Sequence, residues 1–295
     1  MIIWLASYPR SGNTLTRNIF KKTMGFGTYS QHKMAAEVSV KGVDEYGILD
    51  YEGTWENFYK EAANSSELYL IKTHFLPTDN HPVIYVVRDG RLATESYLNQ
   101  YQNRSQRWPG IDAFIPIYFD LLIGRDYYSD WSNHYNAWLR DDNVRRLELR
   151  YEDLVEPTQG LLESIADFVG YQGKIKSFVN ERTKDNKEKP TSEHRGLGSW
   201  LRPEHRTEFE ESIFLCLHGP LMQKLGYITK EEYDVAKEAI DAETQKLAVS
   251  AMQTARERYD YLKMSIEKEV VIQNLLKNQG RLTNGFMSKL KSWIS

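Results

Sequence analysis

Residues 2–14 read IIWLASYPRSGNT, and this stretch decides the fold. Five apolar residues, Ile2 to Ala6, run directly into a tight turn that contains Gly12, and apolar side chains at Leu15 and Ile19 follow at helical spacing. A strand, a glycine turn and a helix start present backbone N–H groups and the positive end of the helix dipole to an anion. The spacing therefore predicts a phosphate loop. An ordinary strand-to-helix turn with a Ser or Asn cap is the alternative, and this segment alone does not separate the two.

The loop departs from the nucleotide-triphosphate pattern GxxxxGK[ST] at two positions. Ser7 stands where that pattern has its first glycine, and Asn13 replaces the lysine that reaches the β- and γ-phosphates. Both changes weaken an interpretation as an ATPase or kinase. Arg10, inside the loop, offers a permanently charged cation beside the anion instead.

Further short apolar runs predict the rest of a sheet. They lie at 68–71, at 83–87 and around Leu147 and Leu149. Helical patterns separate them, at 14–24, 92–100, 130–140 and 159–169. Runs without clean alternation are typical of strands that helices cover on both faces. We expect an α/β fold, a three-layer sandwich with a mostly parallel central sheet, in which ligands bind at the carboxyl ends of the strands.

Composition restricts the class of protein. The 295 residues are 41% hydrophobic and 27% charged, which excludes general disorder. The formal net charge of −3 leaves no overall basic field for nucleic acid, so an anion must be bound locally. A single cysteine, Cys216, excludes a disulfide framework and fits a reducing compartment. No apolar run reaches the roughly 18 residues of a spanning helix, and the N-terminus does not read as a signal peptide. We predict a cytoplasmic protein.

The last quarter of the chain has a different composition. No glycine or proline occurs between Tyr227 and Gln279, and Glu, Lys, Ala and Gln become frequent. We predict an α/β domain at 1–227 and a helical C-terminal extension at 228–295. Near the end, Phe286, Leu290 and Trp293 form a short amphipathic pattern. Docking on the body or self-association through the C-terminal helices is favoured for this face, and peripheral attachment to a membrane surface is the alternative.

Charged and polar side chains follow two more of the predicted strands. Lys72 and His74 come after the second strand, Arg88 follows the third, and Ser96 lies eight residues further along a predicted helix. The simpler interpretations are a satisfied histidine and a local ion pair between Arg88 and its neighbour Asp89. Equivalent positions at the ends of three neighbouring strands favour a shared anion site.

At these residues the sequence resembles the sulfotransferases that use 3′-phosphoadenosine-5′-phosphosulfate (PAPS). The resemblance covers roughly residues 1–227 and rests on six segments in order. The first segment, Tyr8–Thr14, is similar to the 5′-phosphosulfate loop of the family. The second, Lys72–His74 with Pro77, is similar to the element that carries the catalytic histidine, and the third, Val83–Tyr97, is similar to the 3′-phosphate segment. The fourth segment has the W-x-x-H-x-x-x-W spacing of the family at 131–138, and the fifth is the YEDL element at 151–154. The sixth, His194–Trp200, is similar to the loop that closes over the 3′-phosphate.

The resemblance implies a role for each matching residue. His74 is expected to act as general base, while Arg10 and Lys72 stabilise the sulfuryl and leaving oxygens. The expected donor-binding residues are Arg10, Ser11, Gly12, Asn13, Thr14, Arg88, Ser96, Tyr151, Arg195 and Gly196. For Tyr151, adenine contact and core packing remain equal alternatives. PAPS is the expected cofactor, and no metal is expected because the seven histidines include no i, i+4 pair.

Two departures from the family pattern concern how the nucleotide is held. Leu15 stands where many relatives have a tryptophan that stacks on adenine, so that contact is expected to be lost. The late loop is one residue shorter, and only Arg195 and Gly196 carry over. For Trp131, His134 and Trp138, core packing is the favoured interpretation, since aromatic side chains at helical spacing usually face a core.

The acceptor is expected to be a hydroxyl group of a small molecule, lipid or glycan. An aromatic-rich insertion at 99–128 is the natural wall or lid of its pocket, with Tyr101, Trp108, Phe114, Tyr118, Phe119 and Tyr127. Aromatic walls accept alcohols, phenols and sugars alike. Two other functions remain as alternatives, a P-loop kinase of small molecules and a non-enzymatic helical scaffold that binds an anion.

Overall fold

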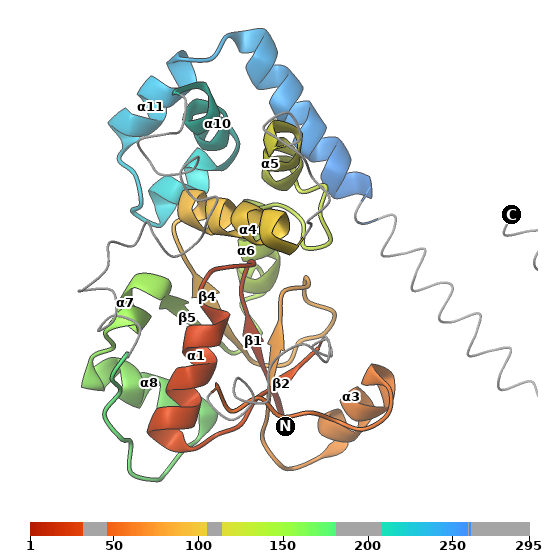
Figure 1. Ribbon diagram of the computed structural model, residues 1–295, viewed down its shortest axis with the longest axis vertical. Helices are drawn as coiled ribbons and strands as arrows, with labels where there is room; N and C mark the ends of the chain where they lie inside the picture. The colour runs from red at the N-terminus through yellow and green to blue at the C-terminus, as the bar shows by residue number, and fades with distance from the viewer. Residues whose placement is uncertain (32–45, 105–113, 181–207, 259, 261–295) are drawn as a thin grey trace, which may run out of the picture.

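The computed structural model describes residues 1–31, 46–104, 114–180, 208–258 and 260. Within these ranges a single parallel sheet has the strand order β2-β3-β1-β4-β5. Its strands are β1 Ile2–Ala6, β2 Tyr29–Ser30, β3 Tyr69–Thr73, β4 Val83–Val87 and β5 Arg146–Arg150. β1 lies in the centre, hydrogen-bonded to β3 on one side and to β4 on the other. The predicted α/β fold with a parallel central sheet is confirmed (Figure 1).

The sheet is covered on both faces because side chains along β1 alternate between two hydrophobic clusters. Ile2 and Trp4 belong to one cluster, and Ile3 and Leu5 belong to the other. Every residue of β1 and β4 is buried, as expected for an apolar run without alternation. Burial of such residues supplies the main driving force for folding, about 1.5–3 kcal/mol for each large apolar side chain.

Helices form the two outer layers. The face with Ile3 and Leu5 is covered by α1 Asn13–Ile19, the π-helix η1 Phe20–Met24, α7 Tyr151–Val155 and α8 Gln159–Val169. The hydrophobic cluster on the face with Ile2 and Trp4 includes side chains of α3 Trp55–Asn64, α4 Gly90–Arg104, α5 Phe114–Ile123, α6 Trp131–Leu139, α10 Glu208–Lys224 and α11 Lys230–Glu238. Among these, α10 packs against α4, α5, α6 and α11. The side chains of Thr54, Asp130, Thr158 and Thr229 cap helices, each accepting a hydrogen bond from a backbone N–H of the first turn.

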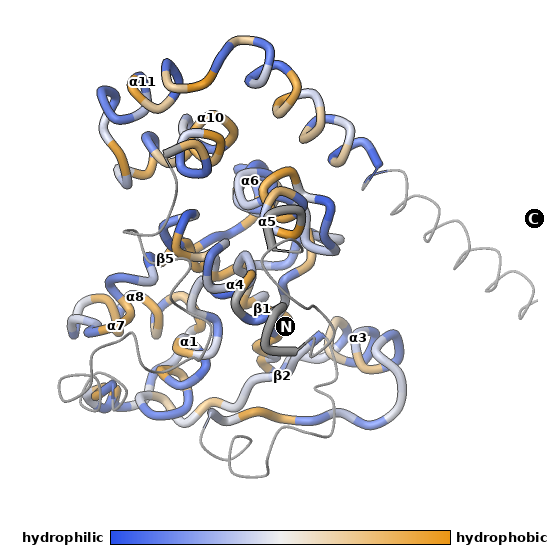
Figure 2. Tube along the Cα trace, turned by 45° about the horizontal axis from the view of Figure 1, so that its top comes forward, coloured by the Kyte–Doolittle hydropathy of each residue, from blue (hydrophilic) through white to orange (hydrophobic). Residues whose placement is uncertain are grey.

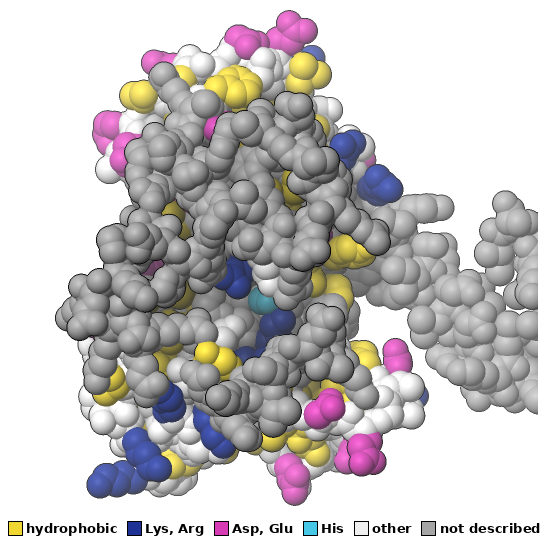
Figure 3. Space-filling view, in the orientation of Figure 1, with side chains coloured by type: hydrophobic (Ala, Val, Ile, Leu, Met, Phe, Trp, Pro, Cys, Tyr) yellow, Lys and Arg dark blue, Asp and Glu magenta, His cyan; other side chains and the backbone are white. Residues whose placement is uncertain are grey.

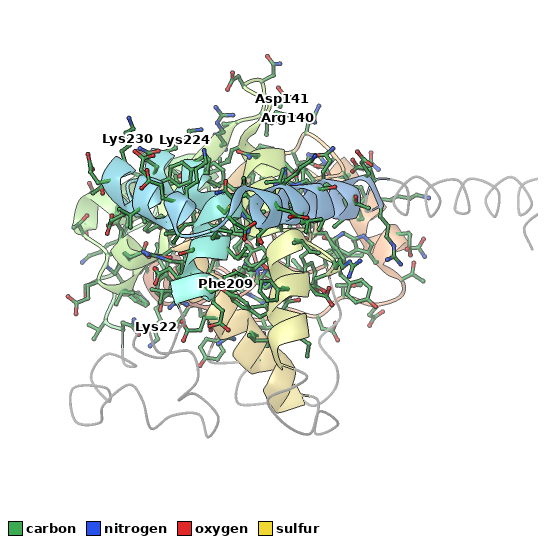
Figure 4. The ribbon with its side chains drawn as sticks, turned by 90° about the horizontal axis from the view of Figure 1, so that it is seen from above. Lys22, Arg140, Asp141, Phe209, Lys224 and Lys230 are labelled. Atoms are coloured by element: carbon green, nitrogen blue, oxygen red, sulfur yellow. The ribbon has the colours of Figure 1, made fainter. Side chains whose placement is uncertain are left out.

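The C-terminal extension contains α11 and a further helix at 242–258, both with hydrophilic and hydrophobic stretches (Figure 2). Ile240 and Met252 belong to the same cluster as Trp4. The helix at 242–258 runs beside α5 in Figures 1 and 4. The division into domains at 227 stays a prediction, and the amphipathic pattern at Phe286 lies outside the described residues. No helix in the described ranges is both long enough and apolar enough to span a bilayer.

Candidate functional site

The carboxyl ends of four strands bring the predicted polar residues to one edge of the sheet. The loop at 7–12 follows β1, His74 follows β3, Arg88 follows β4 and Tyr151 follows β5. Figure 3 shows Lys or Arg side chains and a His side chain gathered in a hollow of the molecule. The structure thus brings together residues that are more than 140 positions apart in the sequence.

Two residues of the loop have a left-handed backbone. Gly12 has φ 111° and Arg10 has φ 67°. A Cβ at Gly12 would lie 2.6 Å from Cδ2 of Tyr151, so glycine is required there by both conformation and space. For a non-glycine residue such as Arg10, this conformation costs on the order of 1–3 kcal/mol, and such strain concentrates at functional sites. The helix α1 begins at Asn13, immediately after the loop.

Asn13 holds the loop against the strand before it. Its Nδ2 donates to the carbonyl of Leu5 at 2.9 Å and lies 3.3 Å from Oγ of Ser7. The Asn13 side chain is therefore directed toward β1, unlike the lysine that this position carries in nucleotide-triphosphate loops. Within the described residues, Ser11 Oγ and Asn13 Oδ1 are buried and have no hydrogen-bond partner. A buried hydroxyl without a partner is costly, and the Ser11 hydroxyl can donate to an anion at the loop, whereas the Asn13 oxygen only accepts hydrogen bonds and cannot bind one.

Arg10, Arg88 and Ser96 lie in contact. Arg10 Nε donates to Ser96 Oγ at 3.0 Å, and Arg88 Nη1 donates to the carbonyl of Arg10 at 3.1 Å. The Asp89 carboxylate pairs with Arg91 at 2.8 Å rather than with Arg88. No carboxylate of the described residues forms an ion pair with Arg88, and its buried Nε has no hydrogen-bond partner among them. The simpler interpretation of an Arg88–Asp89 ion pair is wrong, and the uncompensated guanidinium favours an anion site.

Tyr151 forms one side of this arrangement. Its ring lies against Gly12, and the Arg88 guanidinium carbon is 4.4 Å from the ring centroid. The ring thus supports both the loop and the arginine that is expected to bind the 3′-phosphate. Thr14 is exposed in the first turn of α1, and Leu15 is half-buried beside it. Arg195 and Gly196 lie outside the described residues.

His74 is oriented by the main chain of the first residue of the loop. Its Nδ1 lies 2.7 Å from the carbonyl oxygen of Ser7. Because a carbonyl only accepts hydrogen bonds, Nδ1 carries the proton in the neutral ring, and Nε2 carries the lone pair. The ring of Tyr128 meets the imidazole edge-on at 5.8 Å. The imidazole is thereby tied to the loop in the tautomer that a general base at Nε2 requires.

Lys72 is the fourth residue of β3, so the strand continues past the end at Ile71 that the sequence indicated. It continues because Lys72 and Thr73 pair with Leu5 and Ala6 of β1. Leu70 belongs to the cluster on the α1 side of the sheet, and side chains alternate along a strand. Lys72 therefore extends on the α1 side, where the loop enters its helix.

The predicted acceptor wall is only partly described. Tyr118 belongs to the hydrophobic core and Phe119 packs against it, whereas Tyr127 is 77% exposed. Trp108 and the side chains of Tyr101 and Phe114 are outside the described set. Tyr128, which the sequence did not single out, is the aromatic residue beside His74, and it also contacts Phe75 at 5.4 Å.

A set of contacts beneath His74 was not predicted from the sequence. Trp131, His134 and Trp138 are buried, as their helical spacing predicts. In addition, His134 Nε2 lies 2.8 Å from the carbonyl oxygen of His74, and Trp138 Nε1 donates to the carbonyl of Phe75 at 2.9 Å. The W-x-x-H-x-x-x-W spacing was the available signal, because it places His134 and Trp138 on one helix face. Within the described ranges, no group of three His, Cys, Asp or Glu side chains is arranged to hold a metal ion.

The chain is similar to known proteins in sequence and in structure. The model of the sulfotransferase domain family matches residues 2–213, which is more than half of the chain. The structure is also similar to a mouse sulfotransferase complexed with PAP, with 16% identity, a TM-score of 0.48, and coverage of 81% of this chain and 89% of that one. Retinol dehydratase in complex with androsterone and PAP shows 16% identity and a TM-score of 0.40, with 86% of this chain and 80% of that one covered.

Proposed function

The chain belongs to the sulfotransferase domain family and is a PAPS-dependent transferase, and we propose that it moves the sulfuryl group to a hydroxyl acceptor with His74 as general base. The observation that carries this proposal is the hydrogen bond from His74 Nδ1 to the Ser7 carbonyl. This bond leaves the basic lone pair on Nε2 and holds the ring against the loop. Family membership also decides against the kinase and the non-enzymatic scaffold as alternatives.

The chemistry is an in-line transfer between two oxygens. The acceptor oxygen attacks sulfur as His74 Nε2 takes its proton, and the bond from sulfur to the 5′-phosphate oxygen breaks. Arg10 and Lys72 stabilise the charge that develops on the sulfuryl and leaving oxygens. Arg10 cannot give up a proton in practice, so Lys72 is the proposed proton donor to the leaving phosphate.

The same residues hold the donor. Backbone N–H groups at the start of α1, with Ser11 and Thr14, are proposed to bind the 5′-phosphate. Arg88 and Ser96 are proposed to bind the 3′-phosphate, together with Arg195 and Gly196 of the late loop. The Arg10–Ser96 hydrogen bond joins the two phosphate sites, which favours one rigid surface for both ends of the nucleotide. PAPS is therefore the proposed donor, with PAP as the product left in the site.

The proposed acceptor is an alcohol, phenol or sugar hydroxyl of a small molecule, lipid or glycan. Tyr128 and Phe75 provide an apolar boundary beside His74, which suits the carbon skeleton next to such a hydroxyl. A cytoplasmic location belongs to the same proposal, with attachment at a membrane surface as the alternative.

Two measurements test this function. Isothermal titration with PAP, without magnesium, should give binding in the micromolar range or tighter, and ATP with magnesium should bind more weakly. Incubation with PAPS and a panel of phenols, sterols and sugars, followed by mass spectrometry, should reveal a sulfated product. The variant His74→Ala is the matched control, because it should bind PAP but form no product. Binding of ATP without binding of PAP would overturn the proposal.

A further inference from the structure

The catalytic segment after β3 is attached to helix α6 by two hydrogen bonds to its main chain. His134 Nε2 is 2.8 Å from the carbonyl oxygen of His74, and Trp138 Nε1 is 2.9 Å from that of Phe75. The two donors are four residues apart, so they lie on the same face of α6 and act on consecutive peptide groups. Both side chains are buried in the core.

His134 can make its bond only in one tautomer. The carbonyl of His74 accepts, so Nε2 must carry the proton, and Nδ1 must then accept from the Tyr85 hydroxyl at 2.8 Å. Burial lowers the pKa of His134 to about 4, so the ring is neutral at physiological pH. Burial also raises the pKa of Tyr85 well above its usual value, so the hydroxyl keeps the proton that it donates.

This arrangement also lies against the donor loop. Tyr85 pairs in the sheet with Ala6, the last residue of β1 before the loop, and the ring of Tyr8 meets the His134 imidazole edge-on at 5.9 Å. Two consecutive buried hydrogen bonds therefore run from Tyr85 through His134 to the carbonyl of His74, packed against the Tyr8 ring of the loop. Buried networks in which every member is satisfied are rigid, because breaking one bond leaves a polar group without water or partner.

We propose that Tyr85, His134 and Trp138 are positioning residues, which fix the main chain of the His74 segment relative to the phosphosulfate loop. This inference rests on the proposed function. In-line transfer needs the base within hydrogen-bond reach of the acceptor hydroxyl, and a displacement of about 1 Å can cost ~10²-fold in rate. Loss of these bonds should therefore lower kcat while leaving donor affinity nearly unchanged, because the base contributes little to nucleotide binding.

The first test compares two substitutions on the same helix. Trp138→Phe removes the donor to Phe75 and keeps most of the packing. Tyr135→Phe is the matched control, because Tyr135 is equally buried on α6 but bonds to Glu148 of β5 at 2.9 Å, away from His74. We expect Trp138→Phe to lower kcat by at least ~10-fold, with PAP affinity and the KM for PAPS within ~2-fold of the unaltered chain. Tyr135→Phe should change kcat by less than ~2-fold.

The second test concerns the tautomer. His134→Gln keeps both a donor and an acceptor and should retain more activity than His134→Leu, which keeps neither. With ¹⁵N-labelled histidine, NMR of the unaltered chain should show a slowly exchanging Nε2–H for His134. In Tyr85→Phe that signal should weaken or shift, and kcat should fall in parallel, although Tyr85 does not touch His74 in the structure.

The outcomes separate this inference from the function on which it rests. An unaltered chain that binds no PAP and transfers no sulfuryl group would overturn the proposed function. An active chain in which Trp138→Phe and Tyr135→Phe have equal kcat would overturn only the positioning role. An NMR spectrum with the proton of His134 on Nδ1 would also overturn it, whatever the activity. Should His134→Leu fail to fold, the Trp138→Phe comparison and the spectrum still decide.

Discussion

Acid should destabilise this protein through two histidines that are buried without charge. His134 and His218 are fully buried, and burial lowers the pKa of each to about 4. In the unfolded chain a histidine has its ordinary pKa near 6.5, so the unfolded state takes up the proton first. The stability that depends on the neutral ring is therefore complete above about pH 6.5 and is lost as the pH falls toward 4.

The size of the effect follows from the two pKa values. A difference of about 2.5 units between folded and unfolded states corresponds to about 3 kcal/mol for each histidine at pH 4. Two such histidines together remove a large part of a typical net stability of about 5–15 kcal/mol. Asp130, 3.9 Å from His218, favours the charged ring, while Arg256 opposes it, and burial outweighs the attraction.

The substitution His218→Gln isolates one histidine. Glutamine can still donate to the carbonyl of Leu122 and accept from Ser132, the two partners of the ring, but it takes up no proton. Urea unfolding between pH 4.5 and 7 should show that the slope of the free energy of unfolding against pH falls by about 1.4 kcal/mol per pH unit near pH 5.5. Ile165→Val, in the other hydrophobic cluster, is the control, because it should lower stability by about 1 kcal/mol at every pH.

An unchanged slope in His218→Gln would refute this reasoning. It would mean that His218 takes up its proton equally in the folded and unfolded states, so that burial does not penalise the charged ring. The m-value must stay constant across the series, since a change would indicate a different unfolded state rather than a different protonation.

Three further predictions concern the site and its support. His74→Ala should lower kcat by at least ~10²-fold with PAP affinity nearly intact, measured by product formation and titration calorimetry, and equal losses in both would contradict the role of base. Arg88→Ala should weaken PAP binding by about 1.5–3 kcal/mol, a loss of a charge-assisted contact, and an unchanged Kd would place the 3′-phosphate elsewhere. Arg256→Ala should lower the melting temperature by several degrees in a calorimetric scan. The reason is that Asp130 would stay buried without its bidentate partner, at a cost of about 3 kcal/mol. An unchanged melting temperature would contradict that pairing.

The strands were predictable where burial alone decides the sequence pattern. β1 and β4 appear in the sequence with their observed bounds, because a central parallel strand is apolar at every position. β2 was not predicted, since it has two residues and exists only through its pairing of Tyr29 and Ser30 with β3. The helix predicted at 14–24 continues as η1, and no local pattern distinguishes a π-helix from an α-helix there.

The residues of the candidate site were predictable for a topological reason. Parallel strands place their carboxyl ends at one edge, so residues after three different strands meet whatever their distance in the sequence. The contacts of His134 were not predictable in this way. A buried histidine on a helix has the same local pattern whether it packs or donates a bond, and its partner at His74 is 60 residues away. Such pairings depend on the distance between α6 and the end of β3, which only the assembled core determines.

The pairing of Asp130 with Arg256 bears on how the C-terminal segment should be tested. Asp130 caps α6, the helix that holds the His74 segment, and Arg256 lies in the helix at 242–258. A chain ending near Tyr227 would remove Arg256 and Met252 and leave the Asp130 carboxylate buried without its guanidinium partner. Loss of activity in that truncation would therefore reflect damage to α6 and would say little about a separate role for the extension.

A chain ending at Gly280 keeps the pairing of Asp130 with Arg256 and removes the amphipathic segment at 286–294. If that segment attaches the protein to anionic membranes, the full chain should co-sediment with such vesicles at low salt and the shortened chain should not, with equal kcat for both. Equal co-sedimentation, or none for either chain, would leave docking or self-association as the role of the segment.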